Sequence, residues 1–220
     1  RTEHRMKAKD GSWKWVLDTG RVSQRSEEGA PLRAVGIHLD ITESKMAEEK
    51  LREISIRDPL TNIYNRRYIF DRLRHIVARS RRSGQVLAVA IADIDYFKKI
   101  NDTHGHMAGD FILKEFAGIL GASIREYDLL SRYGGEEFMV LFDGSTSSQA
   151  AEIIERIRLS VSRRAFRLKS GEDVSFTFSC GISDTADFDP EEVNCDSLVE
   201  LADKRLYEAK ENGRNRIIFK

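Results

Sequence analysis

Cysteine is scarce in this chain of 220 residues, which contains Cys180 and Cys195 and no others. Two cysteines without metal-type spacing exclude a disulfide scaffold and a cysteine-based metal site, and they suit a reducing compartment. Long apolar runs are also missing, since no stretch could span a bilayer, and no signal peptide is visible. We therefore expect a cytoplasmic location and no membrane contact for this fragment, although the full-length protein could carry an anchor upstream of residue 1.

Net charge is absent as well, because 36 Lys and Arg residues balance 36 Asp and Glu residues. Such a chain is not expected to bind a nucleic acid polymer through bulk charge, but it can hold a local phosphate site. With 40% hydrophobic and 33% charged residues, it is typical of a soluble globular protein. Its length suits one full domain and part of another. Because it begins abruptly in a strand-like segment at Arg1, we expect a fragment of a longer chain.

Residues 2–40 have the pattern of an all-β segment. Two β-prone runs, 3–8 and 13–24, flank Asp10-Gly11, which is a strong turn signal for a hairpin, and a third run covers 33–41. Three antiparallel strands make a thin core, so we expect the end of a larger domain.

Residues 43–57 predict an amphipathic linker helix. Ala47, Leu51 and Ile54 recur at helical spacing among charged residues. This stripe fits either a short two-stranded coiled coil or one exposed helix packed along one side, and the sequence does not decide between them. Asp58-Pro59 is expected to end the helix, because the residue before proline disfavours helical backbone.

From residue 58 onward the pattern alternates between helices and strands. The run 86–92 is continuously apolar, which is typical of a central strand buried on both faces. We expect an α/β (α+β) sandwich in which helices flank a central mixed sheet. The expected helices cover 66–83 with its polar end 79–84 as a loop, 97–103, 107–125, 150–161 and 197–210, and the further strands cover 129–133, 138–142, 174–182 and 216–219.

A hairpin is predicted around Gly134-Gly135-Glu136-Glu137. Two β-prone runs flank the glycines, and tight hairpin turns demand the positive φ that glycine accepts. Adjacent carboxylates at a hairpin tip gain nothing from packing, so we expect a cation there, and glycine also lets a ligand approach the backbone closely. Taken alone, this segment is more often a solvated acidic turn.

Asp93 and Asp95 stand where the apolar strand ends. Carboxylates are the hard oxygen ligands that Mg²⁺ prefers, and Mg²⁺ usually keeps waters and substrate phosphates in its shell. Asp93 and Glu136 could therefore form a magnesium site from neighbouring strands. The Asp-x-Asp pattern by itself is weak evidence, and a helix N-cap is the commoner use of Asp95.

The next segment has residues suited to a nucleotide. Backbone N–H groups where a helix starts at Phe97, and Lys98 beside them, could bind phosphates. Asn101 and Asp110 could read guanine, because one carboxylate can accept from both donors of the guanine edge while Asn serves the acceptors. The same carboxylate would reject adenine. Two ordinary helix caps are the favoured local alternative.

Lys210 and Arg214 bracket the expected end of the last helix, with Gly213 as the glycine that follows it. The helix dipole favours cations there in any case. The two side chains could also neutralise a triphosphate if the fold brings them to the hairpin. His104 and His106 form a loop His-Gly-His pattern that is more often structural, and we assign them no role.

The run KDGSWKWVLDTGRV…GAPLRAVGIHLDITESK resembles the C-terminal part of a PAS sensor domain, over about residues 1–44. The helix and strands that would complete a PAS ligand pocket are missing from this sequence, so we assign it no ligand. The expected organisation is a PAS-like part at 1–42, a signalling linker helix at 43–57 and a catalytic domain at 58–220.

Four motifs together resemble the GGDEF family of diguanylate cyclases over about residues 55–220. They are DPLTNIYNRR (58–67), DIDYFKKINDTHGHMAGD (93–110), RYGGEEF (132–138) and ADKRLYEAKENGRNR (202–216), in family-like order and separation. The resemblance implies a fold related to nucleotidyl-cyclase and polymerase palm domains. It also implies condensation of two GTP into cyclic di-GMP with release of two pyrophosphates, and the form GGEEF is accepted in active members.

The resemblance implies a role for each matching residue. Asp93, Glu136 and the Ile94 carbonyl would bind Mg²⁺, with Mn²⁺ as an alternative. Glu137 would act near the attacking 3′-hydroxyl or the metals, so the catalytic set is Glu137, Glu136 and Asp93. The implied substrate contacts are Asn101, Asp110, Lys98, Phe97, Lys210, Arg214 and Gly135. Since each domain holds one GTP, the active form is expected to be a homodimer, whose geometry the sensor could set through the linker.

Arg125 and Asp128 match the family's RxxD inhibitory site, at the expected separation from GGEEF. Arginine binds phosphate and guanine edges in a bidentate way, so the resemblance implies product inhibition by cyclic di-GMP here. A chance RxxD is usually a surface salt bridge. The alternative for the whole domain is a catalytically silent cyclic di-GMP receptor, against which the intact carboxylates argue. A cyclase acting on adenine nucleotides is disfavoured by Asp110.

Overall fold

The structure, a computed structural model, describes the backbone of residues 1–220 and all side chains except those of Leu51 and Arg52. It consists of two compact units, Arg1–Ser55 and Ile56–Lys220. None of the helices in the described part of the chain combines the length and apolar character needed to cross a bilayer.

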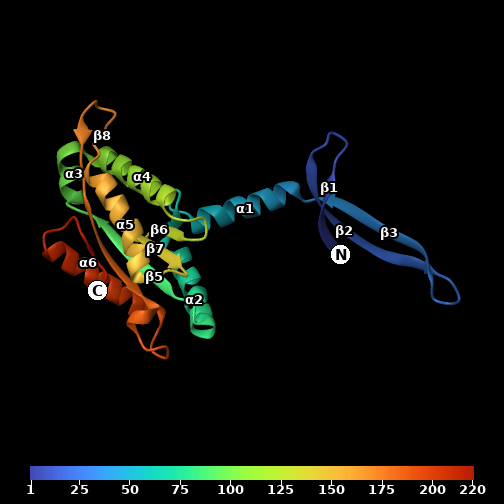
Figure 1. The fold of residues 1–220 in the computed structure, drawn as a ribbon. Coiled ribbons are helices and arrows are strands. Elements are labelled where there is room, and N and C mark those ends of the chain that lie inside the picture. Colours follow the sequence, from blue (N-terminus) through green and yellow to red (C-terminus); the bar gives the residue numbers. More distant parts are fainter. The chain divides into compact units, whose positions relative to one another are not determined.

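The first unit contains the three antiparallel strands that the sequence predicts, in the order β1-β2-β3 (Figure 1). They are β1 (Thr2–Lys7), β2 (Trp13–Arg25) and β3 (Pro31–Asp40). Helix α1 (Thr42–Ile56) follows, and its start is attached to the sheet because the Thr42 hydroxyl accepts a hydrogen bond from the Trp15 N–H at 2.9 Å.

The predicted linker helix is therefore confirmed as a helix, ending before Asp58-Pro59. Two members of its apolar stripe, Ala47 and Ile54, are exposed, and the third, Leu51, lies outside the described side chains. Whether the stripe pairs with a second helix stays a prediction.

The second unit is built on a six-stranded mixed sheet with the order β11-β10-β5-β7-β6-β4. The β4–β6 and β10–β11 pairs are parallel and the others are antiparallel, which confirms the predicted mixed sheet. The strands are β4 (Tyr64–Asn65), β5 (Leu87–Ile94), β6 (Leu129–Arg132), β7 (Glu137–Asp143), β10 (Phe178–Asp184) and β11 (Ile217–Ile218), and a separate small hairpin holds β8 (Phe166–Arg167) and β9 (Asp173–Val174).

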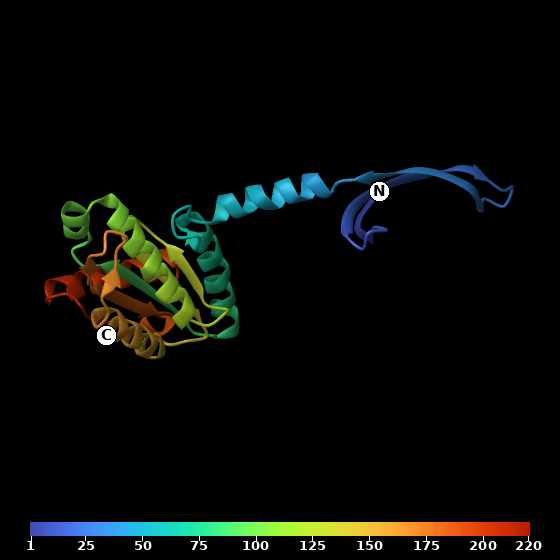
Figure 2. The ribbon, with the colours of Figure 1, turned by 90° about the horizontal axis from the view of Figure 1, so that it is seen from above.

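Helices cover both faces of this sheet (Figures 1 and 2). They are α2 (Arg66–Ser83), α3 (Phe97–His104), α4 (His106–Ser123), α5 (Ser147–Ser162) and α6 (Cys195–Glu211), with a short 3₁₀ turn at Thr185–Asp187. Strand β5 is buried along its whole length. Ala88, Ala90 and Ala92 pack in the core under α3, α4 and α5, whereas Val89 and Ile91 pack in the core under α2 and α6. Because successive side chains of a strand point to opposite faces of the sheet, β5 contributes apolar residues to the core on each side.

Most predicted bounds lie within about three residues of the observed ones, but two elements differ further. Helix α2 continues through the predicted loop to Ser83, because Gly84 adopts φ 71° and its N–H closes the helix on the Ser80 carbonyl. The predicted strand 174–182 is two strands, since Val174 pairs with Phe166 of β8 while Phe178–Asp184 pairs with β5. The first prediction was wrong because the polar end of the helix was interpreted as a loop. The second was wrong because the segment changes its pairing partner between Val174 and Phe178.

Candidate active site

Asp93 lies near the end of β5, between the two strands that flank it. It is opposite Glu137 of β7 and opposite Ser179 of β10 in the sheet register. Only 7% of the residue is exposed, and its Oδ2 lies 2.9 Å from the Nζ of Lys210 on α6. Strand and helix therefore bring a buried carboxylate and a cation together across the core.

The carboxylates of the hairpin act on Asp93 electrostatically. Burial is the largest influence and raises the pKa of Asp93 to about 6, in spite of the ion pair with Lys210. The negative charges of Glu136 and Glu137 raise this pKa further. Both hairpin carboxylates thus repel the Asp93 carboxylate, and an added cation would relieve that repulsion.

The hairpin itself is confirmed, but the predicted backbone of its glycines is wrong. The N–H groups of Tyr133 and Gly134 both donate to the Glu137 carbonyl, at 2.7 and 3.2 Å, so the loop between β6 and β7 is wider than a two-residue turn. Neither Gly134 nor Gly135 has a positive φ. A Cβ at Gly134 would lie 2.3 Å from Glu137 Oε2, so a larger residue there would require the Glu137 carboxylate to move.

Core packing fixes the position of Glu136 and Glu137 in the hairpin. Phe138, directly after Glu137, is fully buried and meets the ring of Phe116 edge-on with centroids 4.9 Å apart. On the neighbouring strand, the Ile94 N–H donates to the Glu136 carbonyl at 3.4 Å. The backbone at Ile94 and Glu136, two of the predicted metal ligands, is therefore held together.

This arrangement fits a magnesium site in which the protein supplies only a few of the ligands. Among the side chains that the structure describes, no group of three or more His, Cys, Asp or Glu is placed to hold a metal ion. Mg²⁺ is commonly bound through one or two carboxylates and completes its shell with waters and substrate phosphates. Asp93, Glu136 and the Ile94 carbonyl offer hard oxygen donors of that kind.

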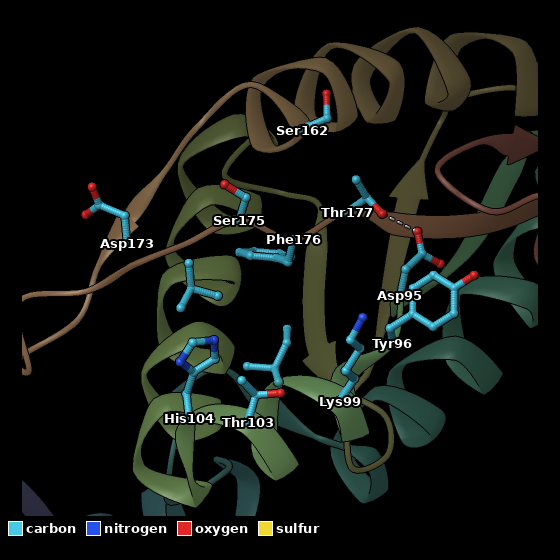
Figure 3. A pocket seen from close by; sticks show the side chains of 12 residues that line it. Asp95, Tyr96, Lys99, Thr103, His104, Ser162, Asp173, Ser175, Phe176 and Thr177 are labelled. Atoms are coloured by element: carbon cyan, nitrogen blue, oxygen red, sulfur yellow. Dashed lines mark hydrogen bonds between the residues drawn. The ribbon is translucent and has the colours of Figure 1, made fainter.

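Asp95 serves a structural purpose instead. Its carboxylate accepts a hydrogen bond from the Thr177 hydroxyl at 2.7 Å (Figure 3). It also accepts from the Ser179 hydroxyl at 2.7 Å and from the Asn215 N–H at 3.0 Å. The N-cap interpretation is wrong, because α3 begins after Tyr96, which has φ 56°. Asp95 joins the end of β5 to β10 and to the segment after α6.

The cavity next to Asp95 is separate from the acidic cluster. It has a volume of about 410 Å³ and is lined by Tyr96, by Lys99 and His104 of α3, and opposite them by Ser175 (Figure 3). None of the three predicted catalytic carboxylates lines it. The histidine is paired with Glu172 at 3.3 Å, in line with the structural role that loop histidines commonly have.

The two predicted guanine-reading residues are brought together by the packing of α3 on α4. A Cβ at Gly109 would lie 2.0 Å from the Asn101 Oδ1, so the Asn101 amide lies against the residue before Asp110. Asp110 also lines a cavity of about 400 Å³ with Met107 and Phe111. Neither polar side chain is an N-cap, because α3 follows Tyr96 and α4 follows Gly105.

The predicted triphosphate contacts lie around the junction of β5 and α3. Phe97 is the first residue of α3 and is buried, so its backbone rather than its ring is available, and Lys98 is exposed beside it. The Arg214 guanidinium lies 4.6 Å from the centre of the Tyr96 ring. Together with the Lys210–Asp93 pair, this contact places Lys210 and Arg214 at the end of β5. Gly213, with φ 103°, follows α6 as predicted.

Arg125 and Asp128 form a turn between α4 and β6. The Arg125 N–H donates to Asp128 Oδ2 at 3.0 Å, while the guanidinium donates to the Tyr127 hydroxyl at 2.9 Å. Asp128 is 6% exposed, and its Oδ1 has no hydrogen-bond partner among the described residues. Both residues line a cavity of about 220 Å³ with Arg57 and Tyr64. The surface salt bridge that a chance RxxD would form is not found between these two side chains.

Two side chains without a predicted role, those of Arg132 and Tyr96, also contact the site. Arg132 donates through Nε and Nη2 to the Gly135 carbonyl, and Tyr96 supports Arg214. Arg132 could have been suspected, because it lies two residues before the loop of residues 134–136 between β6 and β7, the signature loop. Its partners cannot be read from the local pattern.

Comparison with known proteins agrees with this geometry. Residues 55–216 match the family described as "Diguanylate cyclase, GGDEF domain", and residues 1–38 match the family described as "PAS fold". The response regulator PleD of Caulobacter vibrioides is 41% identical over 169 residues, which are 76% of this chain and 37% of PleD. This chain thus spans less than half the length of the curated relatives it matches.

Two solved structures have the same fold as the second unit. The coiled coil and GGDEF domain of DgcB from Caulobacter crescentus, in complex with c-di-GMP, gives a TM-score of 0.77 at 33% identity, covering 82% of this chain and 93% of that one. The active GGEEF domain of a diguanylate cyclase from Vibrio cholerae gives a TM-score of 0.64 at 31% identity, covering 70% and 96%. The fold and the family resemblance expected from the sequence are confirmed.

Proposed function

The chain belongs to the GGDEF family of diguanylate cyclases, and we propose that it condenses two GTP into cyclic di-GMP and releases two pyrophosphates. The observation that carries this proposal is the buried Asp93, which is paired with Lys210 and repelled by Glu136 and Glu137. A buried carboxylate at the end of a central strand, with two further carboxylates acting on it, is suited to a divalent cation that carries a nucleotide.

Asp93, Glu136 and the Ile94 carbonyl would hold Mg²⁺, or Mn²⁺ in its place. A bound divalent cation would supply Lewis acidity toward the phosphates and toward the attacking hydroxyl. Lys210 neutralises Asp93 in the structure, so nucleotide binding would free its ammonium for the triphosphate as the cation replaces it beside the carboxylate.

Guanosine triphosphate fits the polar groups around α3. Asp110 would accept from the guanine N1–H and N2–H₂, with Asn101 serving its acceptors. Adenine would leave this carboxylate without donors, which is the physical basis for discrimination. The triphosphate would contact Lys98, Lys210 and Arg214, with backbone contacts at Phe97 and Gly135.

The condensation of two GTP molecules requires two such domains. Each holds one GTP, and the 3′-hydroxyl of one must be in line with the α-phosphorus of the other, so the active form would be a homodimer. Glu137, opposite Asp93 in the sheet, would lie near the attacking hydroxyl. A sensor upstream could regulate activity by setting the relative placement of the two domains through α1.

Product inhibition would act at Arg125 and Asp128. Asp128 lines a cavity together with Arg125 and Arg57, and its buried Oδ1 has no hydrogen-bond partner among the described residues. A carboxylate next to two arginines suits the guanine edge and phosphates of cyclic di-GMP.

The test is to incubate the protein with GTP and Mg²⁺ and to separate the nucleotides chromatographically. We expect cyclic di-GMP and pyrophosphate in a 1:2 ratio from GTP and none from ATP. Glu136→Gln should abolish turnover, whereas Glu172→Gln, an exposed carboxylate away from the cluster, should not. Tight binding of cyclic di-GMP without any turnover would favour the receptor alternative and refute the cyclase.

A further inference from the structure

One side chain connects the segment after α1 to the signature loop. The Arg132 Nε and Nη2 donate to the Gly135 carbonyl at 3.0 and 2.7 Å. Its Nη1 faces the Asp58 carboxylate, at 3.3 Å from Oδ1 and 3.4 Å from Oδ2. The side chains of Arg132 and Asp58 are 18% and 15% exposed, so this ion pair is largely shielded from water.

Asp58 is itself fixed in place. Its Oδ1 accepts from both the N–H and the hydroxyl of Thr61, at 2.9 and 2.7 Å. Burial alone would raise the pKa of Asp58, but the Thr61 hydrogen bonds and the charge of Arg132 outweigh it and lower that pKa. The carboxylate therefore stays ionised and keeps one edge of the guanidinium occupied.

The local backbone also joins the segment after α1 to β6. Arg57 pairs with Tyr64 in an isolated β-bridge, and Tyr64 in turn pairs with Ser131 of β6, next to Arg132. Asp58 is the second residue after Ile56, where α1 ends. Gly135 directly precedes Glu136. The path from the end of the linker helix to a proposed metal ligand thus runs through one guanidinium.

We propose that Arg132 is a positioning residue, held by Asp58, that sets the orientation of the Gly135–Glu136 peptide and so aims Glu136 at the metal. This inference rests on the proposed function, because it assumes that Glu136 binds the cation. Arginine is required because its planar fork reaches a carbonyl and a carboxylate at once. Lysine, a single nitrogen on a flexible stem, can occupy only one of the two positions.

The test measures metal binding directly. Mn²⁺ is titrated into the protein with an α,β-methylene analogue of GTP, which cannot react, and free Mn²⁺ is followed by electron paramagnetic resonance. Loss of a partner that orients a metal ligand typically weakens metal affinity by about 10- to 100-fold. We expect Arg132→Lys to weaken Mn²⁺ binding by that factor while the thermal unfolding midpoint stays near that of wild type.

Two further variants complete the test. Asp58→Asn keeps an acceptor for Thr61 but loses the charge that holds the guanidinium, so it should weaken Mn²⁺ binding in the same direction. Combining it with Arg132→Lys should add little, because both changes act on one contact. Arg167→Lys changes an arginine whose side chain is 70% exposed and whose partner is Asp173, and it should bind Mn²⁺ as wild type does.

Mn²⁺ binding within twofold of wild type in Arg132→Lys would overturn the proposal, and if that variant fails to fold, the same result in Asp58→Asn would do so. Additive losses in the double variant would also overturn it. Failure of the proposed function has a different signature: wild-type protein would bind Mn²⁺ and the analogue but would form no cyclic di-GMP from GTP.

Discussion

The buried carboxylate of Asp93 makes the stability of the metal-free protein depend on pH. Its pKa is raised from 3.8 to about 6, mainly by burial. The folded state therefore holds its proton more tightly than the unfolded chain. This contribution is fully present below the unfolded pKa and is lost as the pH rises through the folded pKa.

The size of the effect follows from the two pKa values. The difference between about 6 and 3.8 corresponds to about 3 kcal/mol in total, at about 1.36 kcal/mol per pKa unit. Integrated between about pH 5 and about pH 8, it amounts to roughly 1.5 kcal/mol of unfolding free energy. Other groups titrate in the same range, so the measurement must isolate Asp93.

Asp93→Asn isolates it, because asparagine has a similar shape and does not titrate. Urea unfolding of both proteins with a chelator present gives the difference in unfolding free energy, wild type minus variant, at each pH. We expect that difference to fall by roughly 1.5 kcal/mol between about pH 5 and about pH 8. Asp102→Asn, at an exposed position of α3, should show no such trend.

A difference that is constant with pH would refute this prediction, since it would mean that the pKa of Asp93 is the same in the folded and the unfolded protein. Saturating Mg²⁺ with the unreactive GTP analogue supplies a second check. A cation favours the ionised carboxylate, so the bound protein should lose the decline toward high pH.

Three other substitutions test the remaining assignments. Arg125→Ala should relieve inhibition by cyclic di-GMP without lowering the initial rate of GTP turnover, and equal inhibition of the two proteins would remove the product site. Asp110→Asn should raise the KM for GTP by about 10- to 100-fold, because a hydrogen bond to a charged group contributes about 1.5–3 kcal/mol; an unchanged KM would contradict the guanine contact. Asp95→Ala should lower the unfolding free energy by about 2–4 kcal/mol, because it leaves the buried Ser179 hydroxyl unpaired, and urea unfolding that shows a loss below about 1 kcal/mol would mean that its hydrogen bonds matter little.

Local patterns in the sequence were sufficient for the elements of the fold. The apolar run of β5 predicted a central strand, and it is buried along its length. The glycines and the flanking β-prone runs predicted the hairpin. The four motifs, in order, predicted the family that the comparisons show. Each of these signals depends on residues that are neighbours in the chain, where periodicity and turn chemistry act directly.

Only the tertiary structure decided which distant groups meet. Asp95 accepts from residues 82, 84 and 120 positions away, which turns an expected N-cap into a connection between strands. Arg132 meets Asp58 across 74 positions. Sheet register and helix packing select such partners through the burial of the whole domain. A short stretch of sequence carries no record of what lies opposite it. The sequence therefore predicted a positive φ for Gly134 and Gly135, whereas neither has one in the folded domain and the Glu137 carboxylate lies against Gly134.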